Sequence, residues 1–454
     1  MKRFRISTVQ FIPLSFFLTI LIGTILLMLP VSTAPGEETG IVTATFTSTT
    51  SVCVTGLVVV DTYAHWSTFG QAVILTLVQI GGLGVVAVGS MIMLIGRKKF
   101  SLGDRKLLGD SLNIDKNRGL LLFLKRIFKS VFVVEAVGAA LFAVRFIPLL
   151  GVGKGIWASI FQSISAFCNA GMDVVGPNSM IDFQDSTYLM GVTMTLIVLG
   201  GLGFVVWFDV IDGVREGIKK RRSPAKIFRR LPVHSKLVLI MTASLLVGGM
   251  LYVLAAEFHN SDTIGRMPLS KKLLNSMFQS VTFRTAGFAS IPQDKLTEGT
   301  CFLGYLLMFI GGSPVGTAGG VKTVTMFFVF MNAVSYIRGK KENVVFHRRV
   351  SEESMRKAAA VVFVSFVTVF VMTLLLMTRG GIVLTDALYE VVSALATVGL
   401  SRSLTPTLDT IGRLIIIVCM YLGRIGPISM ALFFSKDAGA KNKIRHAEGT
   451  FYVG

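Results

Sequence analysis

The chain has 454 residues, of which 52% are hydrophobic and only 15% are charged, and its mean hydropathy is +0.70. A water-soluble domain carries about 25% charged residues, so this composition excludes an ordinary soluble protein and favours one that crosses a membrane several times. The net charge of +20 would suit a nucleic-acid partner, but the basic residues gather in separate short segments, and no such partner is expected.

Eight apolar stretches are long enough to cross a bilayer. The first, 11–30, follows a basic start (Met1-Lys2-Arg3-Phe4-Arg5) but is too long for the core of a secretory signal, so we interpret it as a span. The other seven are expected at 70–95, 128–150, 187–211, 236–257, 301–334, 357–378 and 411–435. The pattern predicts an all-α polytopic membrane protein.

Most Lys and Arg residues lie at the termini and in alternate loops. The clusters occupy residues 1–5, 97–129, 215–236, 338–357 and 436–445. With eight spans these segments share one side, which predicts a multi-pass topology with both termini in the cytoplasm. The clusters act as topology signals near anionic membrane lipid, as a docking surface for an acidic cytosolic partner, or as both.

A motif that ends in glycine occurs four times, at spacings of 115, 116 and 112 residues: Gly56, Gly171, Gly287 and Gly399. An aromatic residue precedes each glycine by nine or ten positions: Phe46, Phe161, Phe278 and Tyr389. A second glycine or glycine pair follows after 24 to 29 residues: Gly81-Gly82, Gly200-Gly201, Gly311-Gly312 and Gly423. We therefore predict four tandem units of span, re-entrant pore loop and span around one pseudo-fourfold pore, at 1–117, 118–231, 232–345 and 346–454, the last with a cytoplasmic C-terminal tail.

Between the two spans of a unit lies a segment too short to cross the bilayer, such as Trp157–Cys168, Leu273–Phe283 or Leu384–Leu395. Such half-helices would aim their negative C-terminal ends at the axis. Glycine reaches positive φ, so backbone carbonyls beside it can replace the water shell of a cation. The expected carbonyl donors are Cys53, Val54, Thr55, Gly56, Cys168, Asn169, Ala170, Gly171, Arg284, Thr285, Ala286, Gly287, Ala396, Thr397, Val398 and Gly399.

One alternative to the cation filter remains open, and one difference among the loops limits its expected selectivity. The glycines can instead serve close helix packing, although the regular fourfold spacing favours the filter. The residue two before the glycine also differs among the loops (Val54, Asn169, Thr285 and Thr397), which predicts a less uniform and less selective filter.

Two segments, Phe278–Phe288 and Gly311–Thr323, look like signatures of a known family. With them the chain resembles, over essentially its whole length, the Trk/Ktr/HKT superfamily of potassium transporters, and most of all the membrane subunit of bacterial Ktr-type systems. The resemblance implies a K+ filter at the four glycines, and Gly56 in place of serine implies potassium preference. It also implies a bacterial cell-membrane homodimer with one pore per chain, on a cytosolic ring of nucleotide-binding regulatory subunits, with Na+ as an activator or coupling ion.

The sixth span should break within residues 311–320, which hold five glycines and a proline. In a helix glycine costs about 1 kcal/mol and proline about 3 kcal/mol relative to alanine. The resemblance identifies this stretch, here named the intramembrane loop, as a gate below the filter; the alternative is a simple kink. The gate residues are expected to be Gly311, Gly312, Ser313, Pro314, Gly316, Thr317, Gly319, Gly320 and Arg424.

Several charged residues fall near or within the spans. Arg424 should face a cavity or a partner, because arginine at bilayer depth costs roughly 3 to more than 10 kcal/mol; we expect a gate-side electrostatic element, or else a packing pair. Arg284 is expected to be a buried strut that hydrogen-bonds its own loop. Glu135 either couples protons or forms a structural pair. Asp61 and Asp173 either concentrate cations or merely solvate loops.

The leading hypothesis is potassium uptake through a channel-like pore. The alternative is a secondary cation transporter with alternating access, but such proteins usually have two, often inverted, repeats, whereas all four units here start on the same side. The four cysteines and five histidines show no metal-ligand or nucleophile–base spacing, so neither an enzyme, a disulfide framework nor a covalent cofactor is expected.

Overall fold

The computed structural model describes residues 8–96, 108–109, 119–340 and 342–426. Its regular structure is helical except for a two-stranded antiparallel hairpin of β1 (Val344–Val345) and β2 (Arg348–Arg349). The predicted all-α class is therefore confirmed, with this small hairpin as an addition.

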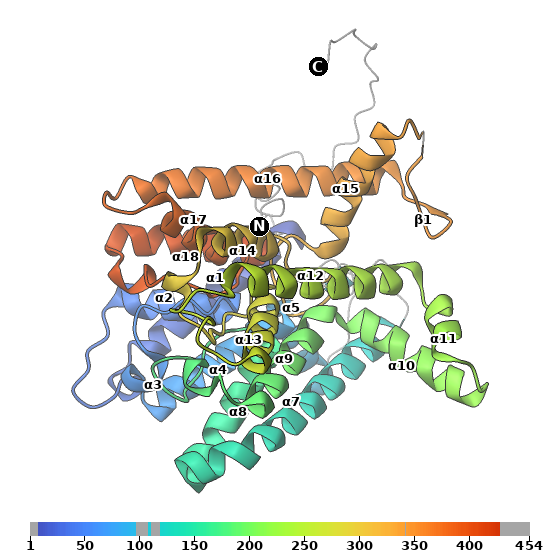
Figure 1. Cartoon of the computed structure of the whole chain (residues 1–454). Coiled ribbons are helices and arrows are strands. Elements are labelled where there is room, and N and C mark those ends of the chain that lie inside the picture. Colours follow the sequence, from blue (N-terminus) through green and yellow to red (C-terminus); the bar gives the residue numbers. More distant parts are fainter. Residues whose placement is uncertain (1–7, 97–107, 110–118, 341, 427–454) are drawn as a thin grey trace, which may run out of the picture.

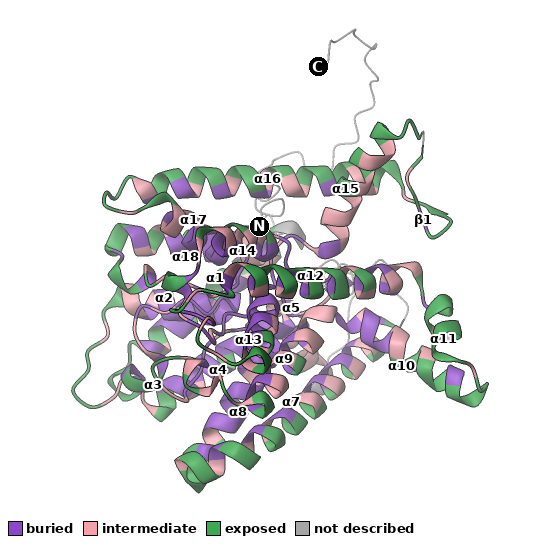
Figure 2. Ribbon diagram, in the orientation of Figure 1, coloured by how far each residue is buried: buried purple, intermediate pink, exposed green. Residues whose placement is uncertain are grey.

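Each unit begins with a long apolar helix: α1 (Thr8–Leu27), α7 (Leu120–Leu150), α12 (Val233–Glu257) and α16 (Glu352–Met377). All four are long and apolar enough to cross a bilayer. A shorter helix follows each one: α2 (Ile41–Cys53), α8 (Val152–Cys168), α13 (Leu269–Thr282) and α17 (Leu384–Leu395). Exposed residues run along α16, α12 and α7, whereas buried residues gather at the centre of the molecule (Figure 2). The short helices are the expected half-helices.

The second helix is interrupted in the first three units. Helices α4 (Thr68–Leu83) and α5 (Val85–Ile95) meet at 94°, and α9 (Thr187–Leu202) and α10 (Phe204–Lys219) meet at 100°. Each of the spans expected at 70–95 and 187–211 is therefore observed as two helices with a sharp bend between them. The reason is a glycine at each corner, Gly84 (φ 90°) or Gly203 (φ 87°), in a conformation that ends a helix and that other residues rarely adopt.

The break expected in the sixth span is present. Helix α14 (Glu298–Phe309) ends before the intramembrane loop, and α15 (Thr323–Ile337) begins after it. Helix α18 (Thr410–Ile425) ends at Gly426, where φ is 92°, and the rest of the span expected at 411–435 lies outside the described residues. The first three units thus share a break near the same point of the second helix, and α18 of the fourth unit ends at the corresponding point of the described residues.

The same contact joins the half-helix to the long helix in the first three units. A serine hydroxyl donates to a backbone carbonyl on the long helix: Ser48 to Ile20 (2.7 Å), Ser163 to Glu135 (2.7 Å) and Ser280 to Leu246 (2.8 Å). Three residues on, the long helix carries Gly23, Gly138 or Gly249, where an added Cβ would collide with that serine. Small residues thus bring the backbones together. Equivalent positions of the first three long helices are therefore occupied by Ile20, Glu135 and Leu246.

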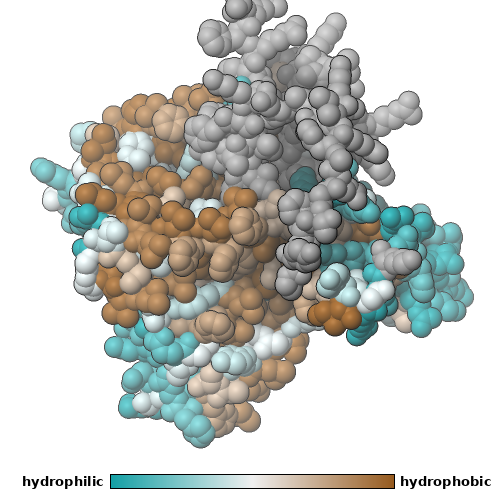
Figure 3. Space-filling model, turned by 90° about the horizontal axis from the view of Figure 1, so that it is seen from above, coloured by the Kyte–Doolittle hydropathy of each residue, from teal (hydrophilic) through white to brown (hydrophobic). Residues whose placement is uncertain are grey.

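The remaining elements are short: α3 (Thr62–His65), α11 (Pro224–Arg230), and the 3-10 turns η1 (Pro30–Ser32), η2 (Ile181–Phe183), η3 (Gln293–Lys295) and η4 (Thr405–Thr407). Helices α10 and α11 and the β1 hairpin lie at the right-hand end of Figure 1, and α3 lies at the left. On the face seen from above in Figure 3, a broad apolar area separates hydrophilic patches. This is the surface expected of a membrane-embedded molecule.

Two basic clusters, within 215–236 and 338–357, occupy the end that carries α10, α11 and the hairpin. Their common side agrees with the positive-inside interpretation. The clusters at 1–5 and 436–445, the segment 97–107, the C-terminal tail and the unit boundary near 117 lie outside the described residues. The orientation of the termini and the boundaries at 231 and 345 stay predictions.

Candidate functional site

The four pore loops, residues 53–56, 168–171, 284–287 and 396–399, share one backbone geometry. Two residues before each glycine the backbone is left-handed: Val54 (φ 54°), Asn169 (φ 60°), Thr285 (φ 65°) and Thr397 (φ 51°). The glycines have positive φ as well: Gly56 (96°), Gly171 (66°), Gly287 (86°) and Gly399 (99°). Three of the left-handed residues are β-branched, and that conformation is strained for them. Backbone strain that recurs at four equivalent places points to a functional site.

The four glycines form a closed ring, here named the glycine ring. A Cβ added to Gly171 would lie 2.8 Å from the carbonyl oxygen of Ala286, and one on Gly287 would lie 2.5 Å from that of Val398. A Cβ on Gly56 would collide with the Ala170 carbonyl, and one on Gly399 with the Thr55 carbonyl. Each unit therefore abuts the next, and the fourth abuts the first. The loops that the sequence placed together do surround one axis.

A hydroxyl clamps each pore loop to its own half-helix. The Thr50 and Ser393 hydroxyls accept from the amides of Gly56 (2.9 Å) and Gly399 (3.1 Å). Thr282 donates to the Phe288 carbonyl (2.7 Å), and Ser165 donates to the Met172 carbonyl. All four hydroxyl residues stand four positions after the recurring aromatic. Sequence reasoning missed them, although this spacing was the signal that could have found them.

One side of the glycine ring opens into a cavity of about 400 Å³. All four ring glycines line it, together with Asp61, Asp173 and Ser179. Burial, reinforced by the Asp61 charge, raises the pKa of Asp173 to about 7. Asp61 itself caps α3, because its carboxylate accepts from the Tyr63 amide (2.8 Å). Both acids thus line the cavity beside the glycine ring, and Asp61 also has a structural role in its own loop.

The second-helix glycines pack against the half-helices. A Cβ on Gly81, Gly200 or Gly423 would collide with the carbonyl of Val52, Phe167 or Leu395. The fourth counterpart, Gly311, abuts Gly319 of the intramembrane loop instead. These glycines therefore do serve close packing, as the alternative interpretation expected, while the ring glycines meet one another around the axis.

The intramembrane loop touches three pore loops from the side opposite the large cavity. Thr317 donates to the Phe167 carbonyl or the Asn169 side-chain oxygen (both 3.1 Å). The Gly319 amide donates to the Thr285 hydroxyl (3.2 Å), and a Cβ on Gly319 would collide with Thr397. Backbone bonds from Ser313 and Thr317 to Gly201 and Gly200 fix it to α9. It lies directly against the second, third and fourth pore loops.

Arg424 links this loop to the first unit. Its guanidinium donates to the carbonyls of Thr317 (2.9 Å) and Gly81 (2.5 Å). Both partners are neutral, so its charge is not balanced by a described carboxylate. Lys322 also lies here and donates to the Ala318 carbonyl (2.6 Å). Two basic side chains therefore lie on the side of the glycine ring opposite the large cavity.

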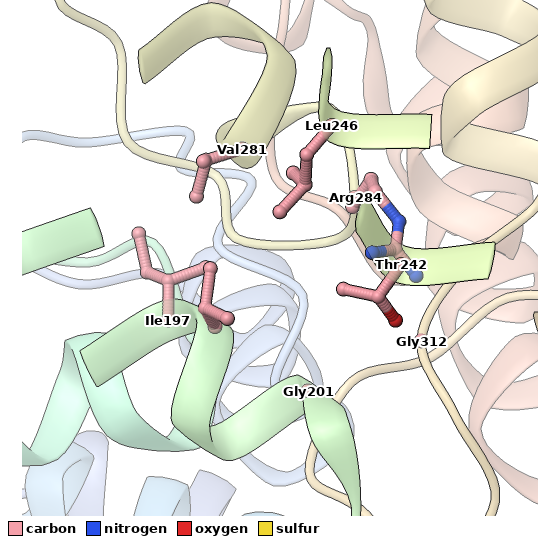
Figure 4. Close-up of a pocket in the computed structure, with 8 residues that line it drawn as sticks. Ile197, Gly201, Thr242, Leu246, Val281, Arg284 and Gly312 are labelled. Atoms are coloured by element: carbon pink, nitrogen blue, oxygen red, sulfur yellow. The ribbon is translucent and has the colours of Figure 1, made fainter. Parts of the chain in front are cut away.

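Arg284 is buried, but its partner differs from the expected one. It donates to the carbonyl of Gly311 (3.1 Å), in the intramembrane loop, and makes no side-chain hydrogen bond to its own pore loop. Its guanidinium lies beside Thr242 and borders a cavity of about 20 Å³, as Figure 4 shows. The Arg284 Nε and the Thr242 hydroxyl are both buried without a hydrogen-bond partner. Arg284 is thus a strut between the third pore loop and the intramembrane loop.

Comparison with known proteins shows to which family this chain is similar. The sequence profile of the family described as "TrkH: Cation transport protein" matches residues 7–444. The chain is 38% identical over 457 residues to the potassium/sodium uptake protein NtpJ of Enterococcus hirae, covering 100% of this chain and 98% of the relative. It is also 38% identical over 453 residues to the Ktr system potassium uptake protein B of Bacillus subtilis, again covering 100% and 98%.

The fold is similar to that of the potassium transporter TrkH from Vibrio parahaemolyticus, whose crystal structure matches with a TM-score of 0.75 at 16% identity, covering 96% of this chain and 86% of that one. At that identity the likeness concerns the fold alone. The family profile and the full-length relatives carry the assignment, and the chain belongs to the TrkH family of cation transport proteins.

Proposed function

We propose that this chain takes up potassium across the cytoplasmic membrane through a channel-like pore, with the four pore loops as its filter. The observation that carries the proposal is the closed glycine ring, in which each loop abuts the next around one axis. Backbone carbonyls around such an axis can replace the hydration shell of a monovalent cation. The names of the full-length relatives, which are potassium uptake proteins, support K+ as the ion, and the name of one adds Na+.

The intramembrane loop is the proposed gate. It lies against three pore loops and is held by backbone and hydroxyl contacts and by the Arg284 guanidinium, with Arg424 as its link to the first unit. A loop of this composition can swing aside without unpacking a helix, because only hydrogen bonds of about 1 kcal/mol each must break. The charge of Arg424 would raise the barrier to a cation while the loop is closed.

The assembly belongs to the same proposal. The chain would work as a homodimer, each copy with its own pore, on a cytosolic ring of nucleotide-binding regulatory subunits. The name "Ktr system" of one relative, which indicates a multi-component system, supports this arrangement, as do the basic segments that share one end of the molecule. Both termini would lie in the cytoplasm, with Na+ as an activator or coupling ion.

Rescue of potassium uptake in a potassium-transport-deficient bacterium tests the function. The intact chain should restore growth at low potassium, and Gly287→Ser should abolish the rescue because the new side chain would meet Val398 and Gly171. Gly191→Ser is the matched control, since nothing lies within 4 Å of its Cβ position. Flux through purified protein in liposomes separates a pore from alternating access, which would give slow, saturable exchange.

A further inference from the structure

Glu135 is a buried acid at membrane depth that the proposed pore does not use. It is 5% exposed, and its carboxyl group accepts two hydrogen bonds from the Gln79 side chain (3.0 and 3.1 Å). None of the described Lys, Arg or His side chains pairs with it. An uncompensated carboxylate within a bilayer costs about 3 kcal/mol or more, so the neutral carboxyl form is favoured. We therefore look for the role of Glu135 in its hydrogen bonds and not in a negative charge.

The Gln79 side chain connects the Glu135 carboxyl group to the second pore loop. Its side-chain oxygen accepts from the Cys168 thiol (3.6 Å), and Cys168 is the first residue of that loop. A Cβ on Gly82 would lie 2.6 Å from the same sulfur, so the thiol has little freedom to move. Ser163, on the half-helix that ends at Cys168, donates to the Glu135 carbonyl (2.7 Å). The Glu135 side chain thus reaches the second pore loop through Gln79, while its backbone carbonyl makes the same contact with the half-helix as Ile20 and Leu246 do in their units.

The next interface, between the second and third units, shows that the fold does not require this chain of polar groups. Leu246 replaces Glu135, Val198 replaces Gln79 at the position two before the glycine pair, and Arg284 replaces Cys168 at the position three before the ring glycine. There the three side chains border the cavity of about 20 Å³ in Figure 4. An apolar residue therefore suffices for packing at this place, and the acid in the second unit serves something else.

We propose that Glu135 is a positioning residue for the second pore loop, acting through Gln79 on Cys168, and that it thereby sets how well the filter discriminates K+ from Na+. The inference rests on the proposed function. Its physical basis is that a filter discriminates ions of different size only while its carbonyls keep their places around the axis. The second loop is the one with Asn169 in the left-handed position, and it has this additional support.

Four variants test the proposal by K+ and Na+ flux into liposomes. Glu135→Leu installs the residue that the third unit carries, and Gln79→Leu removes the intermediate group. Each should lower the K+ over Na+ discrimination about tenfold, and the double variant should be no worse than either single one, because all three act on one contact. Glu135→Gln keeps the shape and the hydrogen bond to Gln79 and should stay within about twofold of the wild type. Ile20→Leu, at the equivalent place of the first unit, is the matched control.

Unchanged discrimination in folded Glu135→Leu and Gln79→Leu proteins would reduce Glu135 to a packing residue and overturn the proposal. Loss of flux in Glu135→Gln would do so too, since it would show that the acid carries a proton or charge. If Glu135→Leu does not fold, as judged by its elution as a single species in detergent, Gln79→Leu alone decides. Absence of K+ flux in the wild type would instead refute the proposed function, and this inference with it.

Discussion

The glycine ring and the intramembrane loop touch each other but are built differently. Every pore loop is clamped by a hydroxyl of its own unit, and the ring closes because one geometry occurs four times. The intramembrane loop occurs once, and besides Arg284 and Thr285 of its own unit it is held by groups from the other units, such as Phe167, Gly200 and Arg424. The ring is therefore a rigid element supported from within, and the loop is a separable one. Changes to the first should abolish selective flux, and changes to the second should release it.

The largest effect is expected for Gly171→Ala. The new methyl group would lie 2.6 Å from the Gly287 Cα atom, and φ at this position is 66°. Strain of about 1–3 kcal/mol together with the displaced carbonyls should lower potassium uptake at least about 100-fold. Rb+ uptake into proteoliposomes measures it. Gly153→Ala, on the same half-helix and with open space around the Cβ, should match the wild type; similar activity of both variants would show that the ring is not the path.

Arg424→Ala should have the opposite effect and increase the K+ flux. It removes the donors to Thr317 and Gly81 and a positive charge beside the path. Loss of hydrogen bonds worth about 1–1.4 kcal/mol should favour the open loop and raise K+ flux roughly five- to tenfold. Single-pore or liposome flux measures this. Arg379→Ala, which breaks only the exposed pair with Asp409, is the control. Unchanged or lower flux in folded Arg424→Ala protein would count against gating.

Thr50→Val examines the hydroxyl clamps. The variant keeps the side-chain shape but leaves the Gly56 amide without its partner. A lost hydrogen bond of about 1 kcal/mol should loosen the first pore loop and lower the K+ over Na+ discrimination about fivefold. Competition of Na+ with Rb+ uptake measures it. Thr45→Val, on the exposed face of the same half-helix, should have no effect; an equal loss in both would mean that the clamp is not specific.

The smallest effect concerns external pH. Because the Asp173 pKa is raised to about 7, its carboxyl group is mostly neutral at pH 6 and mostly charged at pH 8. The charge attracts cations to the large cavity, so the KM for Rb+ should fall about two- to threefold as the external pH rises from 6 to 8. Asp173→Asn should remove this dependence. A wild-type KM that is constant over this range would exclude the charge as a contributor.

The features that recur in all four units could be predicted from the sequence. Four ring glycines, four half-helices and the break before Ser313 follow from periodicity and composition, and the 384–395 half-helix is observed at its expected bounds. The sharp bends at Gly84 and Gly203 were missed because the apolar run continues through them, and only the positive φ of one glycine turns the helix. The partners of Arg284 and Arg424 were also out of reach, because both bond to backbone carbonyls, which leave no mark in a sequence.

The central claim is that the pore loops hold a dehydrated monovalent cation on their common axis. The most direct measurement is the anomalous scattering of crystals soaked in Tl+, which substitutes for K+. The account predicts a peak on the axis, surrounded by carbonyls of all four loops next to Gly56, Gly171, Gly287 and Gly399. Tl+ bound elsewhere, with no peak inside the glycine ring, would contradict it.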